Sequence, residues 1–201
     1  MTKKIIKKYK LEDGGEIKYI KDFINKKDAQ KLFNDLKNNV PWTHGIYKMY
    51  GKEIKTPRLL YAMRDDNIDI TKSYKVTGSM VWSKPMMKLR DNVEKLCNIK
   101  IQYAQLNYYR NGDDYIGYHT DSEMKEGDII ASISLGAERK FILRHKRYKT
   151  DNTIKINKHE FILNDGSLFI MNYNAGKEYW KHTLPKMKNV GPRINITFRP
   201  R

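Results

Sequence analysis

The strongest constraint on the fold lies in the second half of the chain, where short apolar or alternating runs are separated by turn residues. Such runs are typical of β-strands, and many short strands with few helices predict an antiparallel sandwich or jelly roll. Asn111-Gly112-Asp113-Asp114 ends the first run, and Asn164-Asp165-Gly166 is typical of a hairpin turn. The expected strands are residues 101–109, 129–135, 140–145, 153–163, 167–172 and 193–199.

Two helical patterns precede these strands. Residues 28–38 place Leu32, Phe33 and Leu36 on one helical face. A second helix is expected after Ser83, a suitable N-cap, with Pro85 in its first turn. Its apolar residues recur at helical spacing, and they are Met86, Leu89, Val93, Leu96 and Cys97.

These patterns predict one domain over residues 1–201, of the α+β class and mainly β, with the helices packed outside one sheet. Residues 100–201 are expected to form a jelly-roll core, and residues 1–16 a basic N-terminal arm. Residues 40–82 are polar with scattered tyrosine, tryptophan and methionine. We expect them to form hairpins and loops that act as a lid over a substrate.

The chain is strongly basic. It has 40 lysine and arginine residues against 23 aspartate and glutamate residues, which gives a net charge of +17. This excess attracts polyanions, chiefly nucleic acid, and makes such binding sensitive to salt. Most of the excess is lysine, so a lysine-rich proteome is the alternative explanation.

The sequence shows no features of a secreted or membrane-spanning chain. No apolar run approaches the roughly 20 residues that a transmembrane helix needs. The basic start, MTKKIIKKYK, lacks the apolar segment of a secretory signal and is either a solvated arm or a weak nuclear address. The single cysteine, Cys97, excludes a disulfide framework and a cysteine-rich zinc site. We expect an intracellular monomer with no membrane contact, and the nucleus is one location that the basic start leaves open.

The last strand alternates strictly. Ile194, Ile196 and Phe198 share one face, and the opposite face carries two arginines with polar residues between them. On a half-exposed strand this is ordinary alternation. Inside a jelly roll, buried guanidinium groups need partners, and two of them suit the ends of a small dicarboxylate. The polar residues are Arg193, Asn195, Thr197 and Arg199; Asn107 and Tyr109 share a face of an earlier strand.

His119 and Asp121 would point the same way on a strand, and alone such a pair is more typical of a surface. A later histidine, His182, lies shortly before the arginine-bearing strand. Two histidines and one carboxylate are the ligands of the facial triad of non-haem Fe(II) oxygenases. Their presence in this order favours a metal site. The other histidines lack this arrangement (His44, His145 and His159), and His145, in the basic run at residues 144–147, is interpreted as a surface residue.

Several stretches resemble the AlkB family of Fe(II)/2-oxoglutarate dioxygenases. NYYRNGDDYIGYHTDSE, IASISLGAERKFILRHK, DGSLFIMN, HTLPK and PRINITFRPR cover most of residues 100–201. GKEIKTPR and, more loosely, KSYKVTG resemble the nucleotide-recognition lid of that family. The similarity is closest to the double-strand-active DNA repair branch. It implies a double-stranded β-helix that uses Fe(II), 2-oxoglutarate and O₂.

When the roles of the family's residues are assigned to matching positions, the resemblance implies that His119, Asp121 and His182 bind the iron. It implies that Arg193 pairs with the distal carboxylate of 2-oxoglutarate, and that Arg199 lies near the carboxylate that chelates iron. Asn107, Tyr109, Asn195 and Thr197 would complete the cosubstrate site. The implied reaction hydroxylates an N-methyl group, which leaves as formaldehyde. The expected substrates are N1-methyladenine and N3-methylcytosine, whose blocked pairing makes them easy to flip out of a helix.

The resemblance also implies contacts to the substrate. Tyr74 would stack on the flipped base opposite His119, and Ser122 and Glu123 would bond its exocyclic nitrogen, although the family branch often has Asp-Asp-Glu at residues 121–123. Tyr50, at the tip of an expected wedge hairpin, would fill the gap in the duplex. The remaining expected contacts are Lys75, Val76 and Thr77 in the pocket, Gly51 in the hairpin, and Lys52, Lys55, Arg58 and residues 144–147 at phosphates.

Two other functions remain open. A dioxygenase of the same fold that acts on protein or a small molecule would share the metal and cosubstrate residues, but would not need the positive charge or the lid. A basic jelly roll that binds nucleic acid without turnover would tolerate loss of His119 or Asp121. The expected partner is nucleic acid, DNA in particular.

Overall fold

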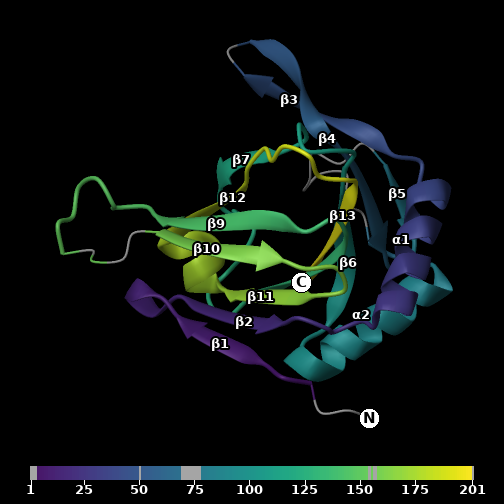
Figure 1. The fold of residues 1–201 in the computed structure, drawn as a ribbon, viewed down its shortest axis with the longest axis horizontal. Coiled ribbons are helices and arrows are strands. Elements are labelled where there is room, and N and C mark those ends of the chain that lie inside the picture. Colours follow the sequence, from purple (N-terminus) through teal and green to yellow (C-terminus); the bar gives the residue numbers. More distant parts are fainter. Residues whose placement is uncertain (1–3, 50, 69–77, 154, 156–157, 201) are drawn as a thin grey trace.

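The structure, a computed structural model, describes residues 4–49, 51–68, 78–153, 155 and 158–200. Two sheets face each other, antiparallel apart from one short strand (Figure 1). This confirms the predicted jelly roll and the mainly β, α+β class. The larger sheet runs β1 (Lys7–Lys10), β2 (Glu16–Ile20), β11 (Leu168–Asn172), β8 (Ile129–Gly136), β13 (Arg193–Pro200), β6 (Ile101–Tyr109), β4 (Lys52–Arg64) and β3 (Thr43–Met49), with β5 (Ser79–Val81) beside β4. The smaller sheet runs β10 (Lys158–Leu163), β9 (Arg139–His145), β12 (Trp180–Leu184) and β7 (Ile116–His119).

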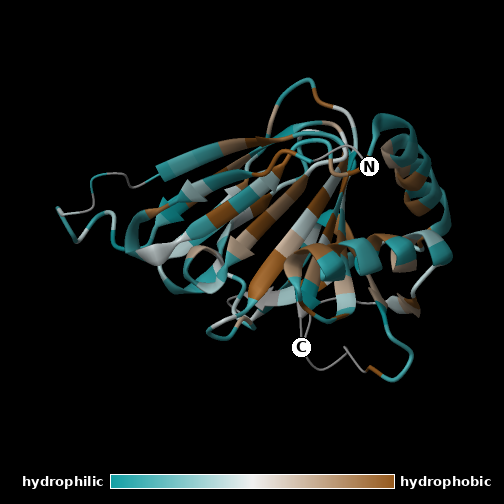
Figure 2. Ribbon diagram, turned by 90° about the horizontal axis from the view of Figure 1, so that it is seen from below, coloured by the Kyte–Doolittle hydropathy of each residue, from teal (hydrophilic) through white to brown (hydrophobic). Residues whose placement is uncertain are grey.

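Both predicted helices form and cover the outer face of the larger sheet. Helix α1 (Lys26–Asn39) begins at Asn25, whose side chain accepts a hydrogen bond from the backbone of Asp28. Helix α2 (Lys84–Cys97) begins after Ser83 as expected. Their apolar stripes pack on the outward-facing residues of the sheet to form the main core, and their hydrophilic sides face solvent (Figure 2). Among the described residues, no helix is long and apolar enough to cross a membrane.

The central strand β13 sets the geometry of the interior. It pairs with β6 on one side and β8 on the other, so its inward-facing residues lie beside those of both neighbours. Arg193 stands opposite Tyr109, and Asn195 opposite Asn107. The outward-facing Ile194, Ile196 and Phe198 are fully buried under the helices. The predicted division of this strand into two faces is therefore confirmed.

The N-terminal segment departs from the expected solvated arm. Strand β1 pairs with β2, and β2 pairs with β11, so much of this segment extends the larger sheet. Leu11 and Ile17 are buried in a second apolar cluster. Lysines dominate the composition of this segment, but the apolar residues at every second position of β2 can bury one face of a strand. The segment therefore joins the sheet and does not remain a solvated arm.

Three other expectations change in detail. The turn at residues 164–166 is not a hairpin, because β10 pairs with β9 while β11 pairs with β8 and β2. The chain crosses there from one sheet to the other. The strand expected from residue 153 begins at Lys158. In the expected lid region, β3 and β4 form a hairpin, but the second half of β4 pairs with β6 and belongs to the core sheet.

Candidate metal centre and cosubstrate pocket

The interior of the jelly roll brings His119, Asp121 and His182 together. His119 ends β7 and His182 lies opposite it on β12, while Asp121 follows in the loop after β7. One ligand atom from each residue lies within 4.8 Å of the other two. The Nε2 atom of His182 is 3.4 Å from an Asp121 carboxylate oxygen. Two imidazoles and one carboxylate at this spacing match the facial triad that binds Fe(II) and leaves positions for other ligands.

The electrostatics of the cluster suit a metal cation. Burial, with repulsion from His182, lowers the pKa of His119 to about 3. Burial also lowers the pKa of His182. Burial alone would raise the pKa of Asp121, but attraction from Arg199 and the two histidines brings it below its usual value. Neutral imidazoles and an ionised carboxylate are the protonation states that a bound metal needs.

Arg199 supports the carboxylate of the cluster. Its Nη2 donates a hydrogen bond of 2.8 Å to Oδ1 of Asp121. Its other terminal nitrogen forms an ion pair with Glu123. The guanidinium therefore lies between two acidic groups, one buried in the cluster and one nearer solvent. This arrangement fixes the direction in which the second Asp121 oxygen points.

A pocket between the sheets adjoins the three residues. The polar face of β13 and the inward face of β6 line it, together with apolar side chains of β11 and of the smaller sheet. The six residues that the sequence predicted for the cosubstrate all line this pocket, and they are Asn107, Tyr109, Arg193, Asn195, Thr197 and Arg199.

Arg193 is the pocket residue whose surroundings best fit an anionic ligand. It is 1% exposed, and burial lowers its pKa to about 10. Its Nη2 donates to Oγ of Ser134 at 2.9 Å, but Nε and Nη1 have no partner among the described residues. Its guanidinium carbon lies 5.3 Å from the ring centre of Tyr109. Because a buried cation with free donors is costly, the position fits an anionic ligand such as a carboxylate.

Sequence comparison supports the same family. A family model described as the 2OG-Fe(II) oxygenase superfamily matches residues 16–199. The DNA oxidative demethylase ALKBH2 of Homo sapiens is 32% identical over 182 residues, which are 87% of this chain and 69% of that protein. The chain belongs to the AlkB family of this superfamily. As an AlkB-family dioxygenase it uses Fe(II), 2-oxoglutarate and O₂, and the triad and pocket fit these groups.

Two further comparisons agree. The ALKBH2 protein of Bos taurus is 31% identical over 87% of this chain, which spans 65% of that protein's length. The structure of OsALKBH1 matches with a TM-score of 0.63 at 14% identity and covers 91% of this chain and 97% of that one. At this identity the structural similarity supports the fold alone.

Only some of the residues expected to contact the substrate of this AlkB-family protein lie within the part of the chain that the structure describes. Tyr50, Tyr74, Lys75, Val76 and Thr77 lie outside the described residues. Gly51, with φ of 77°, forms the tip of the β3–β4 hairpin, and Lys52 is exposed where β4 begins. Ser122 is exposed beside the triad, and Glu123 contacts Arg199.

Arg58 was predicted to contact a phosphate, which requires an exposed side chain, but the structure buries it. Its side chain is buried at 8% exposure, and its Nε donates to Oδ1 of Asn107 at 2.7 Å. The guanidinium therefore reaches the edge of the cosubstrate pocket and is not presented to solvent. Its role as a substrate-binding residue stays a prediction.

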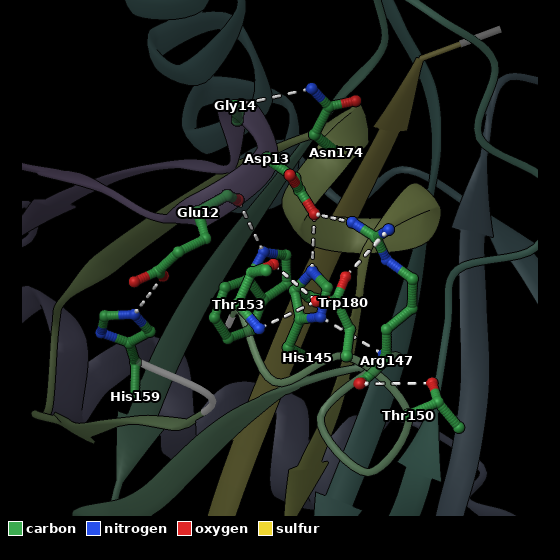
Figure 3. A network of polar contacts seen from close by, with 11 residues as sticks. Glu12, Asp13, Gly14, His145, Arg147, Thr150, Thr153, His159, Asn174 and Trp180 are labelled. Atoms are coloured by element: carbon green, nitrogen blue, oxygen red, sulfur yellow. Dashed lines mark hydrogen bonds and ion pairs between the residues drawn. The ribbon is translucent and has the colours of Figure 1, made fainter. Parts of the chain in front are cut away.

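The interpretation of His145 as a surface residue is wrong. The residue is 1% exposed, and its Nε2 lies 2.9 Å from Oδ2 of Asp13 (Figure 3). The same oxygen accepts a hydrogen bond from Arg147 at 2.7 Å, so this arginine of the basic run is already paired. The alternation of β9 turns His145 inward beside Trp180. The sequence could not show this, because its partner lies far away in the N-terminal segment.

Arg139 was not singled out by the sequence, yet it is fully buried. Its guanidinium donates to the carbonyl oxygens of Asn111 at 3.1 Å, Asp114 at 2.9 Å and Pro185 at 2.7 Å. These carbonyls belong to the loop between β6 and β7 and to the residue after β12. Arg139 therefore fastens together the ends of strands that carry residues of the site. Nothing local in the sequence around it signals burial.

Proposed function

We propose that the protein is an oxidative demethylase of alkylated nucleic acid, and of DNA in particular. It removes N-methyl groups from N1-methyladenine and N3-methylcytosine by hydroxylation, with release of formaldehyde. The observation that carries the proposal is the triad beside a buried arginine, two of whose donors find no partner in the part of the chain that the structure describes. The names of the relatives and the net charge of +17 support nucleic acid as the substrate.

In this proposal His119, Asp121 and His182 hold the iron. When bound, the iron supplies the oxidising chemistry together with O₂ and 2-oxoglutarate. Arg199 keeps Asp121 ionised and oriented, which is the role of residues around metal ligands in many proteins. Loss of any of the three ligands removes the metal site.

The pocket residues bind and orient the cosubstrate. Arg193 pairs with the distal carboxylate through Nε and Nη1, which bond to no other described residue. Asn107, Tyr109, Asn195 and Thr197 add hydrogen bonds along its length. The apolar side of the pocket, including Phe141 and Leu184, excludes water from the bound molecule.

The target base enters beside His119. A methyl group on the pairing edge prevents normal pairing, so extrusion of the base from the helix costs less than for an intact pair. In this proposal Glu123, which forms an ion pair with Arg199, accepts a hydrogen bond from an exocyclic nitrogen of the base. The roles of Tyr50, Gly51, Lys52, Tyr74, Lys75, Val76, Thr77 and Ser122 at the substrate stay predictions.

A mass-spectrometric demethylation assay tests this function. The protein, with Fe(II), 2-oxoglutarate and ascorbate, is given oligonucleotides that carry N1-methyladenine or N3-methylcytosine as single-stranded DNA, duplex DNA and RNA. We expect loss of one methyl group with the wild type and none with His119→Ala. Turnover of 2-oxoglutarate to succinate with the methyl group retained would instead favour a hydroxylase of protein or a small molecule. Binding without either reaction would favour a non-catalytic module.

A further inference from the structure

A single π-helical turn joins β11 to β12. This turn, η2 (Asn174–Glu178), is closed by a hydrogen bond of 3.0 Å from the backbone N–H of Tyr179 to the carbonyl oxygen of Asn174, five residues earlier. Turns with this spacing are rare in proteins and are frequently found at functional sites. Ala175 and Gly176 are buried, so η2 packs into the protein and is not an ordinary surface loop.

The turn is bonded directly to the loop that carries Asp121. The backbone N–H of Asp121 donates to the carbonyl oxygen of Gly176 at 3.0 Å. Further along the loop, Nζ of Lys177 donates to the carbonyl oxygen of Met124 at 2.6 Å. The loop closes on itself through a bond of 3.1 Å from the N–H of Met124 to the carbonyl oxygen of Asp121. Two bonds from η2 therefore hold both ends of the turn at residues 121–124.

Lys177 uses its charge on a backbone group. Its side chain is partly buried, and within the described ranges it forms no ion pair with a carboxylate. Fixing a lysine side chain costs rotamer entropy, so a lysine in a turn usually stays solvated. Here the ammonium group donates to a carbonyl oxygen, and a charge-assisted hydrogen bond of this kind is roughly twice as strong as a neutral one. The bond therefore secures the loop and does not neutralise an acid.

Gly176 allows η2 to approach the metal cluster closely. A Cβ atom at this position would lie 2.6 Å from Sδ of Met124 and 4.0 Å from Oδ2 of Asp121. This oxygen lies 3.4 Å from Nε2 of His182, whereas the other oxygen of Asp121 is held by Arg199. Met124 is 2% exposed, so its sulfur cannot move freely into solvent. Because Gly176 does not have a positive φ, an alanine could adopt its backbone conformation, and only the contact opposes a side chain.

The N-terminal segment holds η2 as well. Nδ2 of Asn174 donates to the carbonyl oxygen of Gly14 at 3.3 Å (Figure 3), and Nδ2 of Asn172 donates to the same oxygen at 2.9 Å. Oδ1 of Asn172 accepts a hydrogen bond of 3.0 Å from the N–H of Ala175. The turn is therefore bonded both to the N-terminal segment and to the loop of Asp121, so it forms a fixed support for that loop.

We propose that Lys177 and Gly176 position Asp121 for metal binding, although neither residue is a ligand. Both act through the backbone of residues 121–124. This inference rests on the proposed function, because it takes Asp121 as a metal ligand. A carboxylate ligand has to be held in one direction, and groups around metal ligands contribute to metal affinity in this way. Loss of either contact lets the carboxylate turn away from the two histidines.

Calorimetric titration of the metal-free protein with Mn(II) tests the role of Lys177. For Lys177→Met we expect the affinity to fall about three- to tenfold, less than the roughly 10- to 100-fold typical of groups that bond a ligand directly. Removal of a positive charge near a cation site would by itself raise the affinity, so a loss identifies the hydrogen bond as the cause. Lys177→Arg keeps a charged donor and should retain most of the affinity.

Lys125→Met is the matched control for charge. Lys125 directly follows Met124, is exposed, and its side chain bonds to no other described residue. The variant removes the same charge from the same part of the chain without removing a hydrogen bond. Its Mn(II) affinity should equal or slightly exceed that of the wild type.

Gly176→Ala tests the close approach of η2. The added methyl group must displace Met124, and we expect the Mn(II) affinity to fall by a similar factor. Adding Met124→Ala removes the sulfur that the methyl group meets and should restore part of the affinity. Gly191→Ala is the control, because the nearest atom to a Cβ there lies 3.9 Å away, at an ordinary contact distance.

Two further measurements report on the position of Asp121 itself. In the metal-free protein, the N–H of Asp121 should exchange with solvent faster in Lys177→Met and Gly176→Ala than in the wild type, because its bond to η2 is weakened. Exchange in the buried strand β8 should not change. The absorption spectrum of the Co(II) complex depends on the arrangement of the ligands, so it should change in both variants and not in the two controls.

Wild-type Mn(II) affinity in both variants would overturn the proposal, as would an equal loss in Lys125→Met. A lower Tm with unchanged metal affinity and Co(II) spectrum would show that η2 only stabilises the fold. The proposal and the proposed function fail separately. If the variants lose metal affinity but the wild type removes no methyl group, the positioning role stands and the demethylase function is wrong. If the wild type demethylates and the variants bind Mn(II) as it does, only the positioning role is wrong.

Discussion

The Nη2 atom of Arg199 lies 2.8 Å from Oδ1 of Asp121, with both side chains buried beside two imidazoles. Burial raises the pKa of Asp121, and attraction from this guanidinium is the largest of the effects that oppose it and lower the pKa. Arg199 thus keeps a negative charge where a metal cation needs it. The same guanidinium reaches Glu123 and so connects the metal cluster with a residue proposed to contact the base.

Replacing Arg199 with methionine should weaken metal binding. Partners of metal ligands typically contribute 10- to 100-fold to metal affinity, and we expect a loss in about that range. Isothermal titration with Mn(II) at neutral pH measures it without redox chemistry. Arg90→Met, which removes a partly exposed ion pair with Asp65 on the far side of the core, should leave the affinity unchanged. Wild-type affinity in Arg199→Met would show that the hydrogen bond to Asp121 does not matter for the metal.

Arg193→Met should affect the cosubstrate and spare the metal. The variant removes the buried donors that have no partner among the described residues. We expect the KM for 2-oxoglutarate to rise at least tenfold, since a hydrogen bond to a charged group contributes about 1.5–3 kcal/mol. Stabilisation by 2-oxoglutarate in thermal unfolding should fall in parallel, while Mn(II) affinity stays near that of the wild type. An unchanged KM would place the distal carboxylate elsewhere in the pocket.

Strand periodicity made the two sheets and the faces of β13 predictable. A period of two assigns Arg193, Asn195, Thr197 and Arg199 to one side whatever the neighbouring strands are. It does not say which strands pair, so the crossing between sheets at residues 164–166 was missed. It also cannot place partners that are far apart in sequence, such as Asp13 and His145. Arg58 and Arg139 appear as ordinary basic residues in the sequence, and only the fold shows that both are buried.

Asp13→Asn should make the protein less stable at neutral pH. Hydrogen bonds from Arg147 and His145 lower the pKa of Asp13, so its contribution is present above the pKa of the unfolded chain, about 4, and is lost as the pH falls through the lower folded value. Asparagine tolerates the positive φ of 54° at this position, so the backbone should not be strained.

Thermal unfolding of this variant across the pH range provides the test. The difference in Tm between the wild type and Asp13→Asn should be largest near neutral pH and should shrink in the acid range. Asp22→Asn, at an exposed aspartate with no ion pair among the described residues, should match the wild type throughout. A difference that does not depend on pH would show that the charge of Asp13 contributes nothing.

Arg139→Met should destabilise the fold and loosen the cosubstrate site together. The change leaves one buried and two partly buried carbonyl oxygens without their donor, which costs roughly 3 kcal/mol in the free energy of unfolding. Those carbonyls hold the end of the strand that carries Tyr109, and the guanidinium lies 5.6 Å from the ring of Tyr109. We therefore expect weaker binding of 2-oxoglutarate even where the variant is fully folded.

Urea unfolding and calorimetric titration with 2-oxoglutarate measure the two effects of Arg139→Met separately. Arg139→Lys keeps the charge but cannot reach all three carbonyls with a planar fork, so it should restore part of the stability and less of the binding. If the methionine variant unfolds at a lower urea concentration but binds 2-oxoglutarate as tightly as the wild type, Arg139 stabilises the strand ends without positioning Tyr109. If neither quantity changes, water replaces the guanidinium at the three carbonyls, and the close approach of the strand ends does not depend on it.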